Sequence, residues 1–332
     1  MSKTTIDVTG VGNAIVDVLA NAEDAFLKEQ EIQKGGMILI DEEQAAKIYG
    51  AMAPGVEVSG GSAANSIACI ASLGGNGGFV GKVAKDALGD VFRHDLKSIG
   101  VKFEAPALEN GPATGRCLVN VTPDAQRSMT TFLGAAGLVS PSDIDDAMIA
   151  QSAVTFFEGY LFEQPVAREA FIAACDAAKK AGRKTALTLS DSSVVERQHD
   201  ALVEFSRAHV DILLANETEA ATLFGSEDIN VIAEKARSLA SLTAVTLSEK
   251  GSILIPREGE IISVDAVKPN QLVDTTGAGD AYAAGLLFGI ARNMPLNTAG
   301  AIGSLAASEV ISHFGARPQQ DLQELAKKSG LL

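Results

Sequence analysis

The chain has 332 residues, and its 42 acidic side chains outnumber its 27 basic ones to give a net charge of −15 at pH 7. Such a charge disfavours binding to nucleic acid or to an anionic membrane, because both need a basic surface. A hydrophobic fraction of 46% with a charged fraction of 21% predicts a folded chain with a large core rather than a disordered one.

Cysteine and histidine are few and scattered. The cysteines are Cys69, Cys117 and Cys175, and the histidines are His94, His199, His209 and His313. The cysteines form no CxxC pair, so we expect reduced core thiols in a cytoplasmic protein. The histidines are unclustered, which argues against a zinc site or a serine triad. Neither a signal peptide nor an apolar run of membrane-spanning length is recognisable.

The first hundred residues predict alternating strands and helices. Residues 6–12 are β-branched and run into glycines, as a strand entering a loop does. Residues 58–75 contain paired glycines followed by a helix of small residues. Further strands are expected at 37–40 and 79–83, extended chain at 14–20, and helices at 23–30, 41–49 and 87–99.

Between residues 101 and 133 the pattern changes. Three strands are expected in succession, at 101–107, 115–121 and 128–133, with turns at 110–112 and 123–124. Strands that follow one another without a helix do not fit a parallel sheet with crossovers. We therefore expect a small antiparallel β lid formed by about 14–20, 36–40 and 101–133.

The alternation resumes after the lid. Strands are expected at 153–157, 184–189, 210–215, 243–247, 252–256 and 260–264, and helices at 166–181, near 201, from 216 to 224, at 229–239, from 277, at 296–313 and from 319. Strands that alternate with helices of this length predict a mostly parallel sheet covered on both faces. The fold class is therefore α/β, and no interdomain linker is evident.

Two common nucleotide-binding motifs are absent. The nearest approach to a P-loop has Asn76 in place of its first glycine and Val83 in place of the hydroxyl residue that holds magnesium. Gly10 and Gly12 begin like a dinucleotide fingerprint, but Ile15 stands at the third glycine position. Neither stretch therefore supports nucleotide binding.

The run V-D-T-T-G-A-G-D-A-Y-A-A at 273–284 precedes an apolar helix. Gly277 and Gly279 allow a ligand to approach the backbone, and the free N–H groups of a first helical turn form an anion site. Asp280 stands in that turn. A first-turn acid often only complements the helix dipole, but the whole run favours proton abstraction beside a phosphate.

Other polar clusters also fall at the ends of predicted strands. Asn216 and Glu219 fit either magnesium binding through waters or ordinary helix capping. The run Gly60-Gly61-Ser62-Ala63-Ala64-Asn65 fits either a polar ligand or close helix packing. Asn13 and Asp17 fit either a diol ligand or turn capping. The turn at 246–251 fits a nucleotide or is only a turn.

Taken in this order, the motifs resemble the ribokinase (PfkB-type) family of sugar and nucleoside kinases. The resemblance extends from Gly12 to about Arg317, and the run D-T-T-G-A-G-D is its most specific signature. It implies one ribokinase-like kinase domain over 1–332, with a three-layer α/β/α core and a β lid.

The resemblance implies roles in phosphoryl transfer for the helix turn. Asp280 would be the base that takes the proton of the accepting hydroxyl. Gly277, Ala278 and Gly279 would supply the amides that hold the transferring phosphoryl group.

It also implies the cofactors ATP and Mg²⁺. Asn216 and Glu219 match the family element that organises magnesium through water. Many members need K⁺, which is bound by carbonyls, so a potassium site is expected near Asp274 and Thr276.

The nucleotide site implied by the resemblance includes Asn216, Thr246, Ser248, Gly251 and Gly279. Ser248 stands where the family usually has glycine.

The sugar hydroxyls would be held by Asn13, Asp17, Gly61 and Asn65, and Arg127 on the lid would meet phosphate when the lid closes.

Within the family, the runs at 12–18, 60–66 and 122–136 are most similar to adenosine kinases of bacteria. This implies phosphorylation of the 5′-hydroxyl of a ribonucleoside, with Leu118, Phe132 and Phe157 as candidates to face the purine. A kinase for ribose, fructose or a sugar acid is the alternative, and a silent sugar- or nucleoside-binding protein is a third. The expected partner is a small molecule, and the protein is a monomer or a homodimer formed through the lid.

Overall fold

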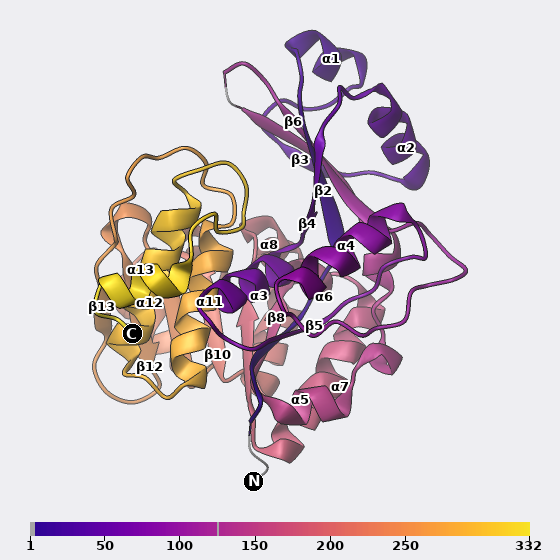
Figure 1. Cartoon of the computed structure of the whole chain (residues 1–332). Coiled ribbons are helices and arrows are strands. Elements are labelled where there is room, and N and C mark those ends of the chain that lie inside the picture. The colour runs from indigo at the N-terminus through magenta and orange to yellow at the C-terminus, as the bar shows by residue number, and fades with distance from the viewer. Residues whose placement is uncertain (1–3, 125) are drawn as a thin grey trace.

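Two β-sheets of unequal size form the frame of the molecule (Figure 1). The computed structural model describes residues 4–124 and 126–332. The larger sheet lies in the body of the molecule, and the smaller one projects from it at the end opposite to the N-terminus. Within the described ranges, no helix has both the length and the apolar character that crossing a bilayer requires.

The larger sheet has eight strands, most of them parallel. In sheet order they are β13 (Ile262–Val264), β12 (Ser252–Pro256), β11 (Leu242–Thr246), β10 (Ile212–Asn216), β9 (Lys184–Thr188), β8 (Ser152–Glu158), β1 (Ile6–Val11) and β5 (Gly77–Val80). Strands β11 to β5 pair in parallel, whereas β12 and β13 add an antiparallel edge. The carboxyl ends of the parallel strands thus meet at one edge.

Helices cover both faces of this sheet. On one face lie α3 (Ser62–Ser72), α4 (Ala87–Ser98), α11 (Ala278–Ala291), α12 (Leu296–Val310) and α13 (Leu322–Lys328). On the other lie α5 (Asp146–Gln151), α6 (Gly159–Phe162), α7 (Pro165–Ala181), α8 (Ser192–His209), α9 (Glu217–Phe224) and α10 (Ile229–Ala236). Neighbouring strand residues point to opposite faces, so Phe156 joins the first core cluster and Phe157 the second.

Helix α11 is buried all round, which explains why its sequence is apolar on every side. It packs between α3 and α12, and Ala281 to Ile290 are all buried. Only its N-terminal turn reaches the edge of the sheet where the strands end. The packing of α11 against α3 and α12 therefore fixes the position of Asp280.

The smaller sheet has five strands in mixed pairing. In sheet order they are β3 (Met37–Leu39), β7 (Arg127–Phe132), β6 (Gly115–Val121), β2 (Ile15–Asn21) and β4 (Val56–Gly60). The pairs β2–β6 and β3–β7 are parallel, whereas β2–β4 and β6–β7 are antiparallel. We call this sheet, with α1 (Asp24–Glu29) and α2 (Glu42–Ala51), the lid.

The lid differs from the sequence prediction in two places. Residues 56–60 form strand β4, which was not predicted. Residues 101–107 are not a lid strand, because Lys102 and Leu108 form isolated bridges with Gly78 and Ala84 beside the larger sheet. Pro106 has no N–H to donate to a ladder, which helps to explain why no regular strand forms there.

Alternation along the lid strands separates a core face from an open face. Val18 and Leu118 pack with Leu27 and Ile48 of the two lid helices in a small core of their own. The opposite face looks toward the larger sheet. Short 3₁₀ turns complete the chain, at η1 (Gly134–Leu138), η2 (Pro141–Asp143) and η3 (Ser248–Lys250).

Candidate active site

A cavity of about 850 Å³ lies between the lid and the edge of the larger sheet where the parallel strands end. It is lined from the sheet side by residues at the ends of β8, β9, β10 and β11 and by the first turn of α11. From the lid side it is lined by β2, β3, β6 and β7. Ligands of open α/β folds bind at this edge, so the cavity is the candidate active site.

The first turn of α11 forms the floor of the cavity. Gly277 precedes the helix with φ = 78°, and a Cβ at this position would lie 2.6 Å from the Cβ of Ala316. Both the conformation and the close approach demand glycine. Thr275, Thr276, Gly277, Ala278 and Gly279 all line the cavity. The space beside Gly279 is open, so its backbone is accessible to a ligand.

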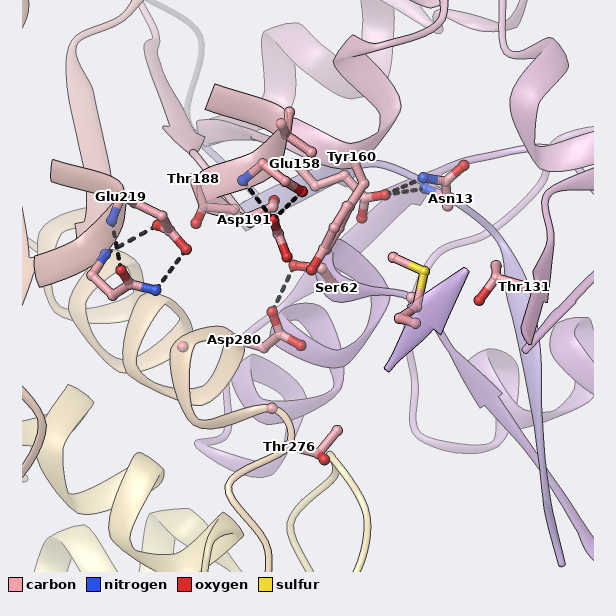
Figure 2. A pocket seen from close by; sticks show the side chains of 18 of the residues that line it. Asn13, Ser62, Thr131, Glu158, Tyr160, Thr188, Asp191, Glu219, Thr276 and Asp280 are labelled. Carbon is pink, nitrogen blue, oxygen red and sulfur yellow. Dashed lines mark hydrogen bonds between the residues drawn. The ribbon is translucent and has the colours of Figure 1, made fainter. Parts of the chain in front are cut away.

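Asp280 lies in the same turn and points toward helix α3 (Figure 2). Ser62 donates a hydrogen bond to its Oδ1 at 2.6 Å, and Asn65 donates to its Oδ2 at 3.2 Å. Protein surrounds the carboxylate except where it opens to the cavity. Burial raises the pKa of Asp280 to about 6, against the lowering effect of Ser62 and Asn65. The group is therefore mostly ionised at pH 7, as a base must be.

A second carboxylate, Glu158 at the end of β8, is fully buried and was not predicted from the sequence. It accepts hydrogen bonds from the N–H and Nδ2 of Asn13, at 2.8 and 2.6 Å, and from the N–H of Ala63 at 2.8 Å. It therefore ties the loop after β1 to the start of α3. Burial raises the pKa of Glu158 to about 7, partly offset by these three bonds.

The amide of Asn13 is thereby held in one orientation. Because its Nδ2 donates to Glu158, its Oδ1 is left as a buried acceptor with no partner among the described residues. Gly61, which connects β4 to α3, has φ = 96°, and a Cβ there would lie 2.1 Å from the carbonyl oxygen of Asn13. Asn13 and Gly61 both line the cavity.

Asp17 extends from β2 into the cavity, which explains why a lone acid stands among valines. Val16 and Val18 face the other way and are buried. Burial raises the pKa of Asp17 to about 7, although the guanidinium groups of Arg317 and Arg127 act to lower it. Asp17, Asn13 and Gly61, three of the four residues expected to bind a sugar, thus line one cavity, whereas Asn65 bonds to Asp280.

Asn216 and Glu219 form a reciprocal cap at the start of α9. The Asn216 N–H and Nδ2 donate to Glu219 at 3.0 and 2.7 Å, and the Glu219 N–H donates to Asn216 Oδ1 at 2.8 Å. Both residues nevertheless line the cavity, as does Asp191. Burial raises the pKa of Glu219 to about 7, and the charges of Asp191 and Asp280 add to the effect.

The expected nucleotide turn is only partly at the cavity. Thr246, at the end of β11, lines it, whereas Ser248 and Gly251 are not among the lining residues. Ser248 has φ = 54° and Gly251 has φ = 89°. Glycine adopts a positive φ readily, whereas a residue with a side chain does so at a cost in free energy. Ser248 therefore holds a less favourable backbone conformation than glycine would at this position.

The side chain of Arg127 extends from lid strand β7 to the core. Its Nη2 lies 2.5 Å from Oδ2 of Asp274, and its Nη1 donates to the Thr276 hydroxyl at 3.2 Å. Its guanidinium also lies over the ring of Phe314, 5.6 Å from the centroid. The residue is not among those lining the cavity. In this structure it therefore acts as a link between lid and core rather than as a cavity residue.

This contact also bears on the expected potassium site. Asp274 Oδ1 accepts from the N–H and hydroxyl of Thr276, and Oδ2 accepts from the N–H of Gly315 and pairs with Arg127. A potassium ion held beside Asp274 and Thr276 would lie next to a guanidinium that already neutralises the carboxylate. The side chains of Asp274 and Thr276 are therefore engaged with protein partners, and the expected site would depend on carbonyl oxygens near them.

The lid side of the cavity is mainly apolar, but the residues differ from those expected. Leu118 and Phe157 are fully buried in core clusters, and Phe132 is 9% exposed, so none of them lines the cavity. Besides Asp17, the residues that line it from the lid are Ile15, Met37, Leu39, Cys117, Met129, Thr131 and Leu133. All three cysteines are free and buried.

Sequence reasoning also missed Ser62, Tyr160 and Asp191, which line the cavity. Ser62 stands inside the glycine-rich run that was singled out. Tyr160 and Asp191 follow strands β8 and β9, so their position just beyond a strand end was the available signal. Figure 2 shows Tyr160 and Ser62 near Asp280, with Glu219 across the cavity.

Comparison with known proteins agrees with this architecture. The family described as pfkB family carbohydrate kinase matches residues 45–322. The crystal structure of adenosine kinase from Sinorhizobium meliloti is 45% identical with a TM-score of 0.91, covering 98% of this chain and 100% of that one. A probable sugar kinase from Rhizobium etli CFN 42 is 40% identical with a TM-score of 0.92, covering 99% and 100%.

A more distant relative covers most of the chain as well. Adenosine kinase 2 of Arabidopsis thaliana is 25% identical over 329 residues, which are 92% of this chain and 94% of that protein. The expected ribokinase-like fold and kinase class are thereby confirmed. The chain belongs to the pfkB family of carbohydrate kinases and is an ATP-dependent kinase.

Proposed function

We propose that this kinase transfers the γ-phosphoryl group of ATP to the 5′-hydroxyl of a ribonucleoside, as an adenosine kinase does. The observation that carries the proposal is Asp280, a carboxylate in the first turn of a buried helix that opens onto the cavity. Beside it, the lid offers an apolar wall. A base in an anion site and a wall for a purine are the two elements that this reaction needs.

Asp280 accepts the proton of the attacking hydroxyl. With a pKa of about 6 it is ionised at neutral pH, yet basic enough to assist as the hydroxyl is phosphorylated. The backbone amides of Gly277 and Gly279 are proposed to face the charge that develops on the transferring group. The Ala278 N–H instead donates to the carbonyl of Thr275 at 3.2 Å in this structure. The proton thus moves to Asp280 Oδ while the hydroxyl oxygen bonds to phosphorus and ADP leaves.

Magnesium is proposed to bind through water near Glu219 and Asn216, with Asp191 also lining the cavity. Carboxylate oxygens are suitable partners for such a cation. Burial and the negative charges of Asp191 and Asp280 raise the pKa of Glu219 to about 7, and a divalent cation would offset the repulsion between these charges. No group of three or more acidic, histidine or cysteine side chains among the described residues is close enough to hold a metal directly. When bound, magnesium neutralises phosphate charge.

The nucleotide is proposed to lie along the ends of β10 and β11, with Asn216, Thr246 and Gly279 near its phosphates. Ser248 and Gly251 shape the turn that follows β11. The side chains at 216 and 219 hold each other through the reciprocal cap, so they present a fixed edge to the nucleotide rather than mobile ligands.

The charges in the cavity favour a nucleoside over a sugar acid. Six lining residues are acidic: Asp17, Glu158, Glu163, Asp191, Glu219 and Asp280. Among the described residues that line the cavity, Arg197 is the one basic side chain, and it pairs with Glu163 at 2.7 Å. A substrate carboxylate would meet no free cation there. Burying an unpaired carboxylate costs free energy. A neutral ribose placed on Asn13 and Asp17, with its base against the lid, avoids that cost.

The lid is proposed to close over both substrates, which would exclude water and limit ATP hydrolysis. Strand β3 is an edge strand of the lid sheet, whereas the other edge strand, β4, bonds to α4 through the Ser59 N–H and Asp95 at 3.0 Å. A homodimer formed through the lid, with β3 as the pairing edge, is proposed beside the monomer.

An ATP-coupled assay across adenosine, inosine, ribose, fructose and a sugar acid tests the proposal. We expect adenosine to have the highest kcat/KM, and 5′-deoxyadenosine to bind without being phosphorylated. The product should carry phosphate at the 5′ position by ³¹P NMR. Higher kcat/KM with ribose, fructose or the sugar acid than with any nucleoside would contradict the proposal.

A further inference from the structure

The carboxylate of Asp280 is held from outside its own helix by the first turn of α3. The hydroxyl of Ser62 donates to Oδ1 at 2.6 Å, and Nδ2 of Asn65 donates to Oδ2 at 3.2 Å. Ser66, one turn further, donates to the carbonyl oxygen of Asp280 at 3.0 Å. Three donors of one helix thus hold both carboxylate oxygens and the main chain of a residue more than 200 positions away.

We infer that Ser62 is a positioning residue that holds the Asp280 carboxylate in the orientation and the ionised form required for proton abstraction. The inference rests on the proposed function of Asp280 as the base. Ser62 has the shortest of the three bonds, and its partner is the charged group itself rather than the main chain. Hydrogen bonds to charged groups are the stronger class.

The geometry gives Ser62 a role that Asn65 does not fill. Arg317 Nε donates to Oδ1 of Asn65 at 3.4 Å, which fixes the amide so that Nδ2 faces Asp280. Asn65 therefore restrains Oδ2 only. The bond from Ser62 to Oδ1 adds the second and shorter restraint on rotation about the Cβ–Cγ bond of Asp280. With both oxygens restrained, each keeps a lone pair for the substrate hydroxyl.

The surroundings show why the ionised form needs such help. The titratable groups that interact with Asp280 through charge are Asp17 on β2, Glu158 on β8, Tyr160 on α6, Glu219 on α9 and Cys69 on α3. The carboxylates among them repel a charge on Asp280 when ionised. Burial raises the pKa of Asp280, whereas the bonds from Ser62 and then Asn65 lower it.

The test compares Ser62→Ala with Ser62→Thr, and with Ser72→Ala as the matched control. Ser72 ends the same helix and bonds to the main chain of residues 320 and 322, far from the carboxylate. For Ser62→Ala we expect kcat to fall by about 10- to 100-fold, since a hydrogen bond to a charged group is worth about 1.5–3 kcal/mol. Adenosine KM should change little.

The pH dependence separates positioning from a general structural effect. The acid limb of the kcat profile should move to higher pH in Ser62→Ala, because the bond that favours the ionised form is gone. Ser62→Thr keeps the hydroxyl and should recover most of the lost kcat and the original limb. An unchanged kcat and acid limb in Ser62→Ala would overturn the inference.

Two further results keep the inference distinct from the proposal on which it rests. Near-normal turnover in Asp280→Asn would overturn the proposed base itself, whatever Ser62 does. If Asp280→Asn is inactive while Ser62→Ala matches wild type, only the inference about Ser62 fails. Should thermal melting show Ser62→Ala to be unfolded, Ser62→Cys keeps the volume with a weak donor: a shifted acid limb supports the inference, and a wild-type limb overturns it.

Discussion

Arg127 of the lid and Asp274 of the core form an ion pair, with Arg127 Nη2 2.5 Å from Asp274 Oδ2. The two side chains are 12% and 7% exposed, so water screens them little. Asp274 begins the loop that leads into the proposed anion-binding turn of α11, and Arg127 begins lid strand β7. The pair therefore joins lid position directly to the loop that supports the proposed transfer site.

This pair predicts a kinase that does not depend on potassium. The positive charge beside Asp274 is already supplied by the guanidinium, so replacing KCl with choline chloride at equal ionic strength should leave the initial rate unchanged. Arg127→Met removes that charge and should make the rate rise with K⁺, while Arg207→Met, an exposed residue of α8, should not. Strong stimulation of the wild-type enzyme by K⁺ would contradict the prediction.

The apolar lid wall makes a prediction about substrate affinity. Leu39 on β3 lines the cavity and is 55% exposed, so a purine would cover apolar surface that water now reaches. Leu39→Ala should raise adenosine KM about fivefold, as expected for about 40 Å² of lost apolar contact, and leave kcat unchanged. Val56→Ala is the control, since Val56 is 65% exposed on β4 but is not a lining residue. Steady-state kinetics measures both, and an unchanged KM in Leu39→Ala would contradict the proposed purine position.

What the sequence predicted well depends on interactions between near neighbours. The turn from Thr275 to Asp280 combines glycines, first-turn N–H groups and a following apolar helix, all within a few residues. The same holds for Asn216 and Glu219, whose spacing of three produces the reciprocal cap. Helix capping depends on residues close together in the chain, so a single sequence can indicate it. The starts of α11 and α9 were therefore predicted at their observed positions.

What the sequence could not provide depends on strand order. Glu158 and Asn13 are 145 positions apart and meet because β8 pairs with β1. Ser62 and Asp280 meet because α3 packs on α11. No periodicity encodes either contact. Strand β4 was not predicted because Pro54 and Gly55 precede it, which is typical of a loop. Its first residues, Val56 and Glu57, are exposed rather than packed against a core.

The buried carboxylate of Glu158 predicts a measurable effect on stability. Its pKa is about 7 in the folded state, above the ordinary value of 4.5. The native state therefore binds more protons than the unfolded state between these values, and stability is lost as pH rises toward 7. Glu158→Gln cannot ionise. The Tm of the variant relative to wild type should thus increase from pH 5 to pH 7 and then level off.

Differential scanning fluorimetry at fixed ionic strength measures this difference. Glu204→Gln, on the exposed side of α8, is the control and should give a Tm difference that does not vary with pH in this way. A constant Tm difference between Glu158→Gln and wild type across the same range would show that Glu158 titrates normally in the fold.

The sharpest prediction concerns Asp280 itself. Asp280→Asn keeps the shape of the side chain and a bond from Ser62, but it cannot accept a proton. Loss of a general base should lower kcat by roughly 10²–10⁴, while binding of ATP and adenosine, measured by calorimetry, should persist. Glu234→Gln on α10, an exposed acid far along the other face, controls for a change of net charge.

The pH profile of the wild-type enzyme provides the second half of that test. Because burial places the pKa of Asp280 near 6, kcat should fall as pH drops below about 6, where the carboxylate becomes protonated. The residual rate of Asp280→Asn should lack this acid limb, since asparagine does not titrate. An acid limb that survives in Asp280→Asn would assign the titration to another carboxylate, such as Asp17 or Glu219, and would contradict the prediction that Asp280 titrates near pH 6.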